Sequence, residues 1–232
     1  MAQPFTQPKS GRKVMVLLGL GLLLVAAIVF FWGNGSWRQE LRLHVSTPGG
    51  PIEPSQVIEV KFEKGSDWLG EFSRDRLRLK GEALVVELGE KRLFVLLDGE
   101  TGRWVWRARI DPLPRKERRS MAADLRRIKR QYDPLDLPRE LWPRMVTFGD
   151  VTDSTSVVAV DPEDLAATFG PGFALERITV AATKDPISPA TIRSLLTWLS
   201  DYPEPLLCPP SDEGESIPLC RRVKHGDFAR TT

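Results

Sequence analysis

The first strong pattern along the chain is an uninterrupted apolar run near its N-terminus. The nineteen residues from Val14 to Trp32 include no charged side chain. A helix rises about 1.5 Å per residue, so a run of this length reaches close to the ~30 Å hydrocarbon core of a bilayer. The pattern therefore predicts a single transmembrane helix over residues 14–32, which would bind the lipid bilayer.

Two alternatives for this run stay open, a cleaved signal peptide and a buried core helix. A secretory signal has a shorter apolar region of about 7–15 residues, followed by a small-x-small cleavage site. Here the only candidate site is Gly33-Asn34-Gly35, and the bulky residues 30–32 separate it from the apolar run. We favour an uncleaved signal anchor.

Charges beside the run predict its orientation. Lys9, Arg12 and Lys13 precede it without any acid. Short segments rich in Lys and Arg stay in the cytoplasm, whereas large domains are translocated largely regardless of charge. We therefore expect residues 1–13 to form a cytoplasmic tail and the rest of the chain beyond the span to lie outside the cytoplasm.

A period-two alternation of apolar and polar residues begins after a short linker at residues 33–38. It runs through ELRLHVST, which starts at Glu40, and QVIEVKFE, which starts at Gln56, and it indicates half-buried strands. Residues 83–111 predict three strands joined by tight turns, hence an antiparallel meander. Trp104 and Trp106 would share one face of the third strand. We favour sheet packing for them, with a ligand platform as the alternative.

Helical signals dominate the second half of the chain. Apolar residues recur at helical spacing within 115–132, which predicts a basic amphipathic helix with a stripe of Met121, Leu125, Ile128 and Tyr132. Capping signals predict two further helices, one from Asp161 to Gly170 and one from Ser188 to residue 201.

The order of these elements predicts the fold class and the domain limits. Three more strands, RMVTF, TSVVAV and ALERITVAA, fall between the predicted helices. Residues 203–232 are rich in proline and are predicted to form an irregular tail. We expect an N-terminal transmembrane helix followed by one small α+β domain over residues 39–202, with an antiparallel sheet and two or three helices.

Charge is concentrated in the predicted basic helix. Residues 115–130 hold eight Lys or Arg and two acids, a net charge of +6, although the whole chain carries only +2. A solvated helix face explains this, and a surface on anionic lipid headgroups is the alternative. Nucleic acid is not an expected partner of a domain outside the cytoplasm. The candidate lipid or partner surface comprises Arg118, Arg119, Arg126, Arg127, Lys129, Arg130, Trp104 and Trp106.

The chain has two cysteines, Cys208 and Cys220, in the segment CPPSDEGESIPLC. In an oxidising compartment they are predicted to form a disulfide, which would stabilise the domain by roughly 3 kcal/mol in the chain-entropy model. Two free thiols are the alternative. A metal site would need more ligands than this segment offers, because His225 is the only histidine nearby.

The most particular pieces of the chain are VIEVKF, GEALVVELGEKRLFVLL, VTFGDVTDSTSVVAVDPEDLAATFGPG and ERITV, which lie between Leu41 and Leu199. They resemble a family of uncharacterised bacterial single-pass membrane proteins. The resemblance implies a small envelope domain that is anchored in the inner membrane and faces the periplasm. It implies no catalytic or binding residue.

Motifs for catalysis are missing from the sequence. It contains no GxSxG, HExxH or paired CxxC motif and no phosphate-binding loop, and its two histidines are His44 and His225. Five acids between Asp150 and Asp164 fit no calcium loop, which favours turn and capping roles. No catalytic, cofactor-binding or metal-binding residue is therefore predicted.

Two function classes follow from these observations. We favour a non-enzymatic interaction module whose partner is another envelope protein or the lipid surface. The rival is an envelope hydrolase that uses Asp or Glu residues, since the separation of such a carboxylate pair depends on the fold.

Overall fold

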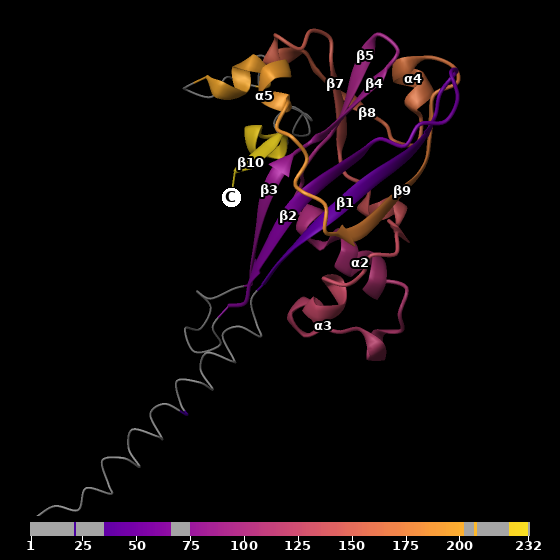
Figure 1. Cartoon of the computed structure of the whole chain (residues 1–232). Helices are drawn as coiled ribbons and strands as arrows, with labels where there is room; N and C mark the ends of the chain where they lie inside the picture. The colour runs from indigo at the N-terminus through magenta and orange to yellow at the C-terminus, as the bar shows by residue number, and fades with distance from the viewer. Residues whose placement is uncertain (1–20, 22–34, 66–74, 202–206, 208–222, 232) are drawn as a thin grey trace, which may run out of the picture.

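The computed structural model describes residues 21, 35–65, 75–201, 207 and 223–231. Over these residues the fold is α+β, with two antiparallel sheets and four α-helices (Figure 1). The predicted class is thus confirmed, with a second sheet that the sequence did not predict. In this part of the chain no helix is both long and apolar enough to cross a membrane. The predicted span over residues 14–32 lies outside it, apart from Gly21.

A six-stranded antiparallel sheet in the order β10-β3-β2-β1-β9-β6 forms the larger part of the domain. Strand β1 is central, because it pairs with β2 on one side and with β9 on the other. The strands are β1 (Gly35–Ser46), β2 (Ser55–Glu63), β3 (Arg76–Glu82), β6 (Leu135–Asp136), β9 (Ala174–Thr183) and β10 (Ala229–Thr231).

Strand β1 follows the alternation that the sequence predicts. Trp37, Leu41, Leu43 and Val45 are buried together with Gln39, and the residues between them are polar and more exposed. Since successive side chains in a strand point to opposite faces, one face of β1 meets the core and the other faces solvent. The predicted strands around residues 40–47 and 56–63 are confirmed.

A smaller antiparallel sheet in the order β4-β5-β7-β8 packs beside the first. Only Ala83 separates β3 from β4, so one extended stretch serves both sheets. The turn between β4 and β5 contains Gly89 at φ 64°, a left-handed conformation that favours glycine. The strands are β4 (Leu84–Leu88), β5 (Lys91–Val95), β7 (Met145–Phe148) and β8 (Val157–Val160).

The smaller sheet is buried on both faces at its centre. In β5, Leu93 and Val95 belong to the main core, whereas Phe94 between them belongs to a second core. In β7, Met145 belongs to the main core and Val146 to the second core. A strand buried on both faces has a continuous apolar sequence, which explains the run RLFVLL.

The helices are short and cover the ends of the sheets. Helix α2 packs against β9, β6 and α3, and α2 and α3 lie together at the lower end of the domain in Figure 1. The α-helices are α2 (Trp104–Ile110), α3 (Met121–Ile128), α4 (Leu165–Phe169) and α5 (Ile192–Leu195). The 3-10 turns are η2 (Thr101–Arg103), η3 (Arg115–Glu117), η4 (Arg139–Leu141), η5 (Ser154–Ser156), η6 (Thr197–Ser200) and η7 (His225–Asp227).

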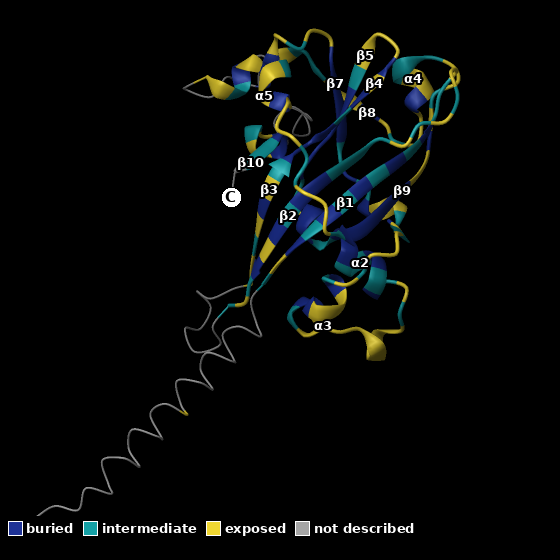
Figure 2. Cartoon of the chain, in the orientation of Figure 1, coloured by how far each residue is buried: buried dark blue, intermediate teal, exposed yellow. Residues whose placement is uncertain are grey.

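Residues 104–110 form helix α2, so their prediction as the third strand of a meander is wrong. Trp104, Val105 and Ala108 are buried, a spacing that places them on one helical face. Figure 2 shows buried residues in α2. Tryptophan and valine favour strands only where they pack on a pleated surface, and here burial of the helical face overrides that preference.

The three predicted helices are shorter than expected. The basic segment 115–132 divides into η3 and α3, because Arg118 and Ser120 are extended between them. Helix α4 begins at Leu165, and Asp164 rather than Asp161 caps it by accepting a 3.1 Å hydrogen bond from Ala167 N. A capping side chain compensates amides that have no partner within the helix.

Ser188 does not cap the helix that was predicted to begin there. Its hydroxyl instead accepts a 2.9 Å hydrogen bond from Val57 N in β2. The shorter helix α5 is capped from outside, because Glu82 Oε2 at the end of β3 accepts hydrogen bonds from Thr191 N (2.6 Å) and Ile192 N (2.8 Å). A cap supplied from a distant strand leaves no local signal in the sequence.

The end of the chain is part of the fold, contrary to the prediction of an irregular tail over residues 203–232. Strand β10 pairs with β3, and Val223 and Phe228 are buried in the second core. Asp227 O accepts a hydrogen bond from Leu97 N, and Phe228 O accepts one from Ala83 N. Residues 223–231 thus join both sheets. Cys208 and Cys220 lie outside the described residues.

Candidate functional site

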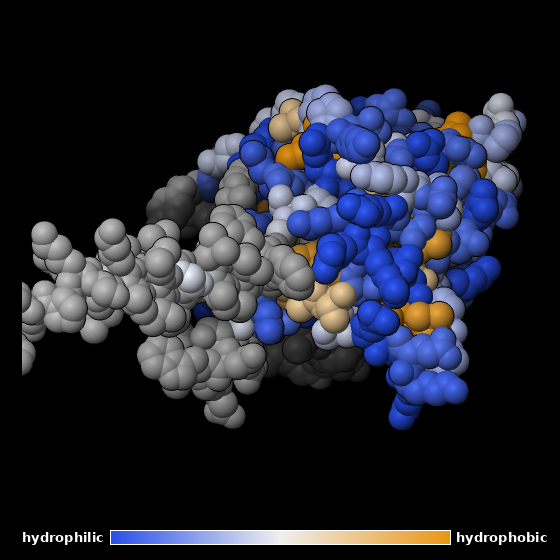
Figure 3. All heavy atoms as spheres, turned by 60° about the horizontal axis from the view of Figure 1, so that its bottom comes forward, coloured by the Kyte–Doolittle hydropathy of each residue, from blue (hydrophilic) through white to orange (hydrophobic). Residues whose placement is uncertain are grey.

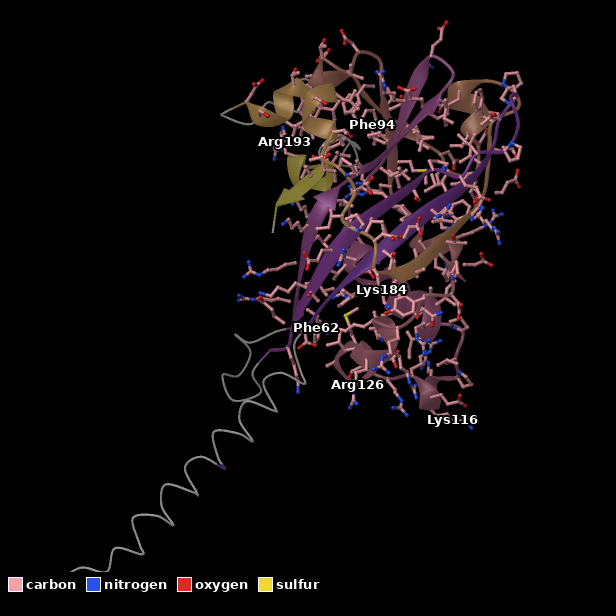
Figure 4. All side chains as sticks on the ribbon, in the orientation of Figure 1. Phe62, Phe94, Lys116, Arg126, Lys184 and Arg193 are labelled. Carbon is pink, nitrogen blue, oxygen red and sulfur yellow. The ribbon has the colours of Figure 1, made fainter. Side chains whose placement is uncertain are left out.

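The cations of the predicted basic helix lie on η3, α3 and the residues beside them, at the lower end of the domain. We call this set the basic surface and define it as Arg115, Lys116, Arg118, Arg119, Arg126, Arg127, Lys129 and Arg130. All of its members are exposed except Lys129, which is half-buried. Figure 4 places Lys116 and Arg126 at this end and Arg193 at the opposite end of the domain.

Helix α3 presents Arg126 and Arg127 to solvent because its opposite face is buried. Ser120 Oγ accepts a 3.3 Å hydrogen bond from Ala123 N, which caps the helix. Met121, Leu125 and Ile128 enter the main core, as the predicted stripe requires. Tyr132 belongs to the predicted stripe but follows the helix, and its side chain is 48% exposed.

Few acids compensate the basic surface. Its buried acid, Asp124, is 2% exposed, and Arg127 and Arg109 lie 3.7 Å and 3.5 Å from its carboxylate oxygens. Arg118 donates instead to the carbonyl oxygens of Asp111 and Leu113. Within the described ranges the remaining members that make no ion pair are Arg115, Lys116, Arg119, Lys129 and Arg130.

The basic surface touches the first residue of β1. A β-carbon built on Gly35 would lie 2.8 Å from Lys129 Cε and 3.3 Å from Leu125 Cδ2. The end of the Lys129 side chain therefore lies directly against Gly35. Gly35 is paired with Phe62, which Figure 4 labels at the same end of the sheet.

The two tryptophans of the candidate surface are not a ligand platform. Trp104 is 1% exposed and packs in the main core, and Trp106 is partly buried against the same core. Both indole Nε1 atoms are buried and make no hydrogen bond to the part of the chain that the structure describes. The structure thus separates the tryptophans from the exposed cations with which the sequence grouped them.

An open groove of about 370 Å³ lies beside α3, between Tyr132 and the end of β9. Its polar lining includes Glu40, Lys184 and Asp185. The Lys184 ammonium lies 5.4 Å from the centre of the Tyr132 ring, within the range of a cation–π contact. The charges of the groove are mixed in sign, so it does not extend the basic surface.

No protein-family model, curated protein or solved structure matches this chain. Three polar clusters of the domain bear on whether it has an active site.

His44 takes part in an arrangement that resembles a catalytic triad in its connectivity. Glu53 Oε1 lies 3.0 Å from His44 Nδ1, and Thr179 Oγ1 lies 3.3 Å from His44 Nε2. A nucleophile must be accessible to its substrate. Thr179 is 6% exposed and is paired on both sides, with Arg42 and Asp136. The cluster fits a structural polar network on the sheet better than an active site.

The acids between residues 150 and 164 have local structural roles. Hydrogen bonds from the Thr152 backbone and side chain lower the pKa of the Asp150 carboxyl. Asp153 caps η5 and Asp164 caps α4, and Glu163 pairs with Arg139 at 3.0 Å. Among the described residues no group of three or more side chains is placed to hold a metal ion. The predicted turn and capping roles are confirmed, with Asp164 in place of Asp161 as the helix cap.

A charged network around Asp227 was missed by the sequence analysis. Asp227 is 5% exposed, and Arg144 and Arg230 approach its two carboxylate oxygens at 3.1 Å and 3.3 Å. Nearby, burial raises the pKa of the Asp98 carboxyl, against the opposing effects of hydrogen bonds from Glu100 and Thr101 and of the charge of Arg144. The network holds the C-terminal residues in place. Arg144 is 83 residues away from Asp227 in the sequence, so no local spacing could have signalled that ion pair.

Proposed function

We propose that this chain is a single-pass, membrane-anchored envelope protein whose folded domain is a non-enzymatic interaction module in the periplasm. Residues 14–32 tether it to the inner membrane, and residues 1–13 stay in the cytoplasm. The cysteines at 208 and 220 are in an oxidising compartment in this arrangement, which suits a disulfide.

One observation carries the proposal. Strand β1 begins at Gly35, and only Gly33 and Asn34 separate it from the end of the predicted span at Trp32. Two residues leave almost no free tether, so the domain would be held at the bilayer surface. A module in that position is suited to contacts with the membrane or with other proteins anchored in it.

The polar clusters of the domain support a non-enzymatic role. Carboxylates that could serve a hydrolase are used as helix caps and ion pairs, as with Glu82, Asp164 and Asp227. The acid–histidine–hydroxyl arrangement at His44 has a hydroxyl group, that of Thr179, which is buried in the sheet.

Membrane extraction and reporter fusions test the proposal. The chain should resist alkaline carbonate extraction, and a reporter fused after Thr232 should be active only outside the cytoplasm. A control variant with Leu22→Arg, Leu23→Arg and Leu24→Arg places three charges at the centre of the span, each costing about 2.5–3.5 kcal/mol there. Its release into the soluble fraction is expected. Release of the unmodified chain by carbonate, or cytoplasmic reporter activity, would overturn the proposal.

A further inference from the structure

The charge of the domain is distributed unevenly, and the fold places the positive charge of the basic surface at one end. Residues 115–130 carry +6, whereas the other residues after position 32 carry −7 together. These cations lie on η3, on α3 and on the residues directly beside them, and Figure 4 shows Lys116 and Arg126 at one end of the domain. The domain is therefore strongly polarised, with its positive end at the start of β1.

The contact between Lys129 and Gly35 sets the distance of this end from the membrane. Gly35 follows Trp32 by three residues. An extended chain covers at most about 3.6 Å per residue, so Gly35 lies within about 11 Å of the end of the predicted span. The headgroup layer is about 5–8 Å deep on each side of the hydrocarbon core. Lys129 and the cations beside it are thus within reach of the headgroups.

We propose that the basic surface docks on the anionic phospholipid headgroups of the bilayer that holds residues 14–32. This inference rests on the proposed membrane anchor and names the partner of the anchored domain. Docking fixes the orientation of the domain, because the excess negative charge of its remaining surface is repelled by the same headgroups.

The contact is electrostatic and does not insert a helix into the bilayer. An interfacial helix buries its apolar face among the lipids. Here Met121, Leu125 and Ile128 are already buried in the protein core. Figure 3, which brings the lower end of the molecule forward, shows a largely hydrophilic surface with scattered apolar spots. Such docking is screened by salt, since the Debye length falls to about 3 Å at 1 M.

The magnitude follows from the cations that make no ion pair in the described part of the chain. Each cation near an anionic surface contributes about fivefold to the docked-to-undocked ratio. Lys116, Arg119 and Arg130 are exposed members of this group. Replacing the three by glutamine should therefore lower the ratio by about a hundredfold.

The test uses the full-length chain in nanodiscs. A fluorophore is attached at Ala123→Cys, an exposed position of α3, in a background of Cys208→Ser and Cys220→Ser. Nitroxide-labelled headgroups quench the fluorophore when α3 is docked. We expect strong quenching in nanodiscs that contain phosphatidylglycerol, weak quenching in pure phosphatidylcholine, and loss of the difference at 1 M salt.

Two triple variants separate docking from mere tethering. Lys116→Gln, Arg119→Gln and Arg130→Gln together should abolish the dependence of quenching on lipid charge. The matched control is Lys91→Gln, Arg92→Gln and Arg193→Gln, which removes the same charge from the opposite end of the domain. In this variant quenching should still depend on lipid charge.

The outcomes distinguish failure of the docking from failure of the anchor. Lipid docking is overturned, while the anchor stands, if quenching is equal in both lipid compositions or if the two triple variants behave alike. The basic surface would then bind a protein partner. A chain that fails to enter nanodiscs overturns the anchor and the docking together.

Discussion

The C-terminal segment should be indispensable to stability, and Phe228 is the residue that tests this most directly. Phe228 is 0% exposed. Its ring lies 6.3 Å from Phe94, 5.9 Å from Phe148 and 5.7 Å from Trp198, measured between ring centres. These rings come from β5, β7 and η6, so Phe228 joins three separate parts of the second core.

The replacement Phe228→Ala should lower the free energy of unfolding by about 4 kcal/mol. Truncation of a buried phenylalanine costs about 3–5 kcal/mol, and edge-to-face aromatic pairs add about 0.5–1.5 kcal/mol to the burial of their area. A typical domain is stable by only about 5–15 kcal/mol, so the variant would be close to unfolding.

Urea titration of the full-length chain in mild detergent measures this loss. Emission of the seven tryptophans, Trp198 of the second core among them, reports unfolding, and far-UV circular dichroism provides a second probe of two-state behaviour. Phe173→Ala is the matched control, because Phe173 is only partly buried and pairs with Phe169 at 6.3 Å. It should cost less than half as much. A Phe228→Ala variant within about 0.5 kcal/mol of the unmodified chain would show that residues 223–231 are not part of the stable fold.

Three further outcomes are expected. Glu82→Ala should cost about 2–3 kcal/mol and speed hydrogen exchange at Ile192, because two amides lose a charged acceptor, whereas exposed Glu87→Ala should be nearly neutral. Burial raises the pKa of Asp98, so above pH 3.8 the folded state binds more protons than the unfolded state. The stability of the folded state therefore falls as the pH rises from 3.8 toward the raised pKa. Asp98→Asn should remove this dependence in urea titrations at pH 3 to 7. Non-reducing peptide mapping should link Cys208 to Cys220, and recovery of both as alkylated thiols from untreated envelopes would contradict the disulfide.

Strands β1 and β2 were predictable because one face of each is buried and the other is not. The alternation in β1 and β2 follows directly from that asymmetry. Strand β3 has the same signal, with Leu77 and Leu79 between cations, yet it was missed because its polar positions are all charged. Strand β10 was missed because the proline-rich composition before it suggested an irregular tail.

What the sequence could not predict depends on contacts between distant residues. Helix α2 and the Glu82 cap are both set by packing that no local pattern records. The same holds for the candidate site. The excess of cations in residues 115–130 is visible in the sequence, but their separation from Trp104 and their contact with Gly35 are products of the fold.

The contact between Lys129 and Gly35 connects the charge pattern with a proposed partner. A basic helix far from the tether would be one solvated face among many, and its charge would then favour solubility without specifying a partner. Because Lys129 lies against the residue where the domain begins, the cations of α3 face the same boundary that the apolar run is predicted to cross. The position of Gly35, more than the number of cations, is what distinguishes headgroup docking from a solvated surface.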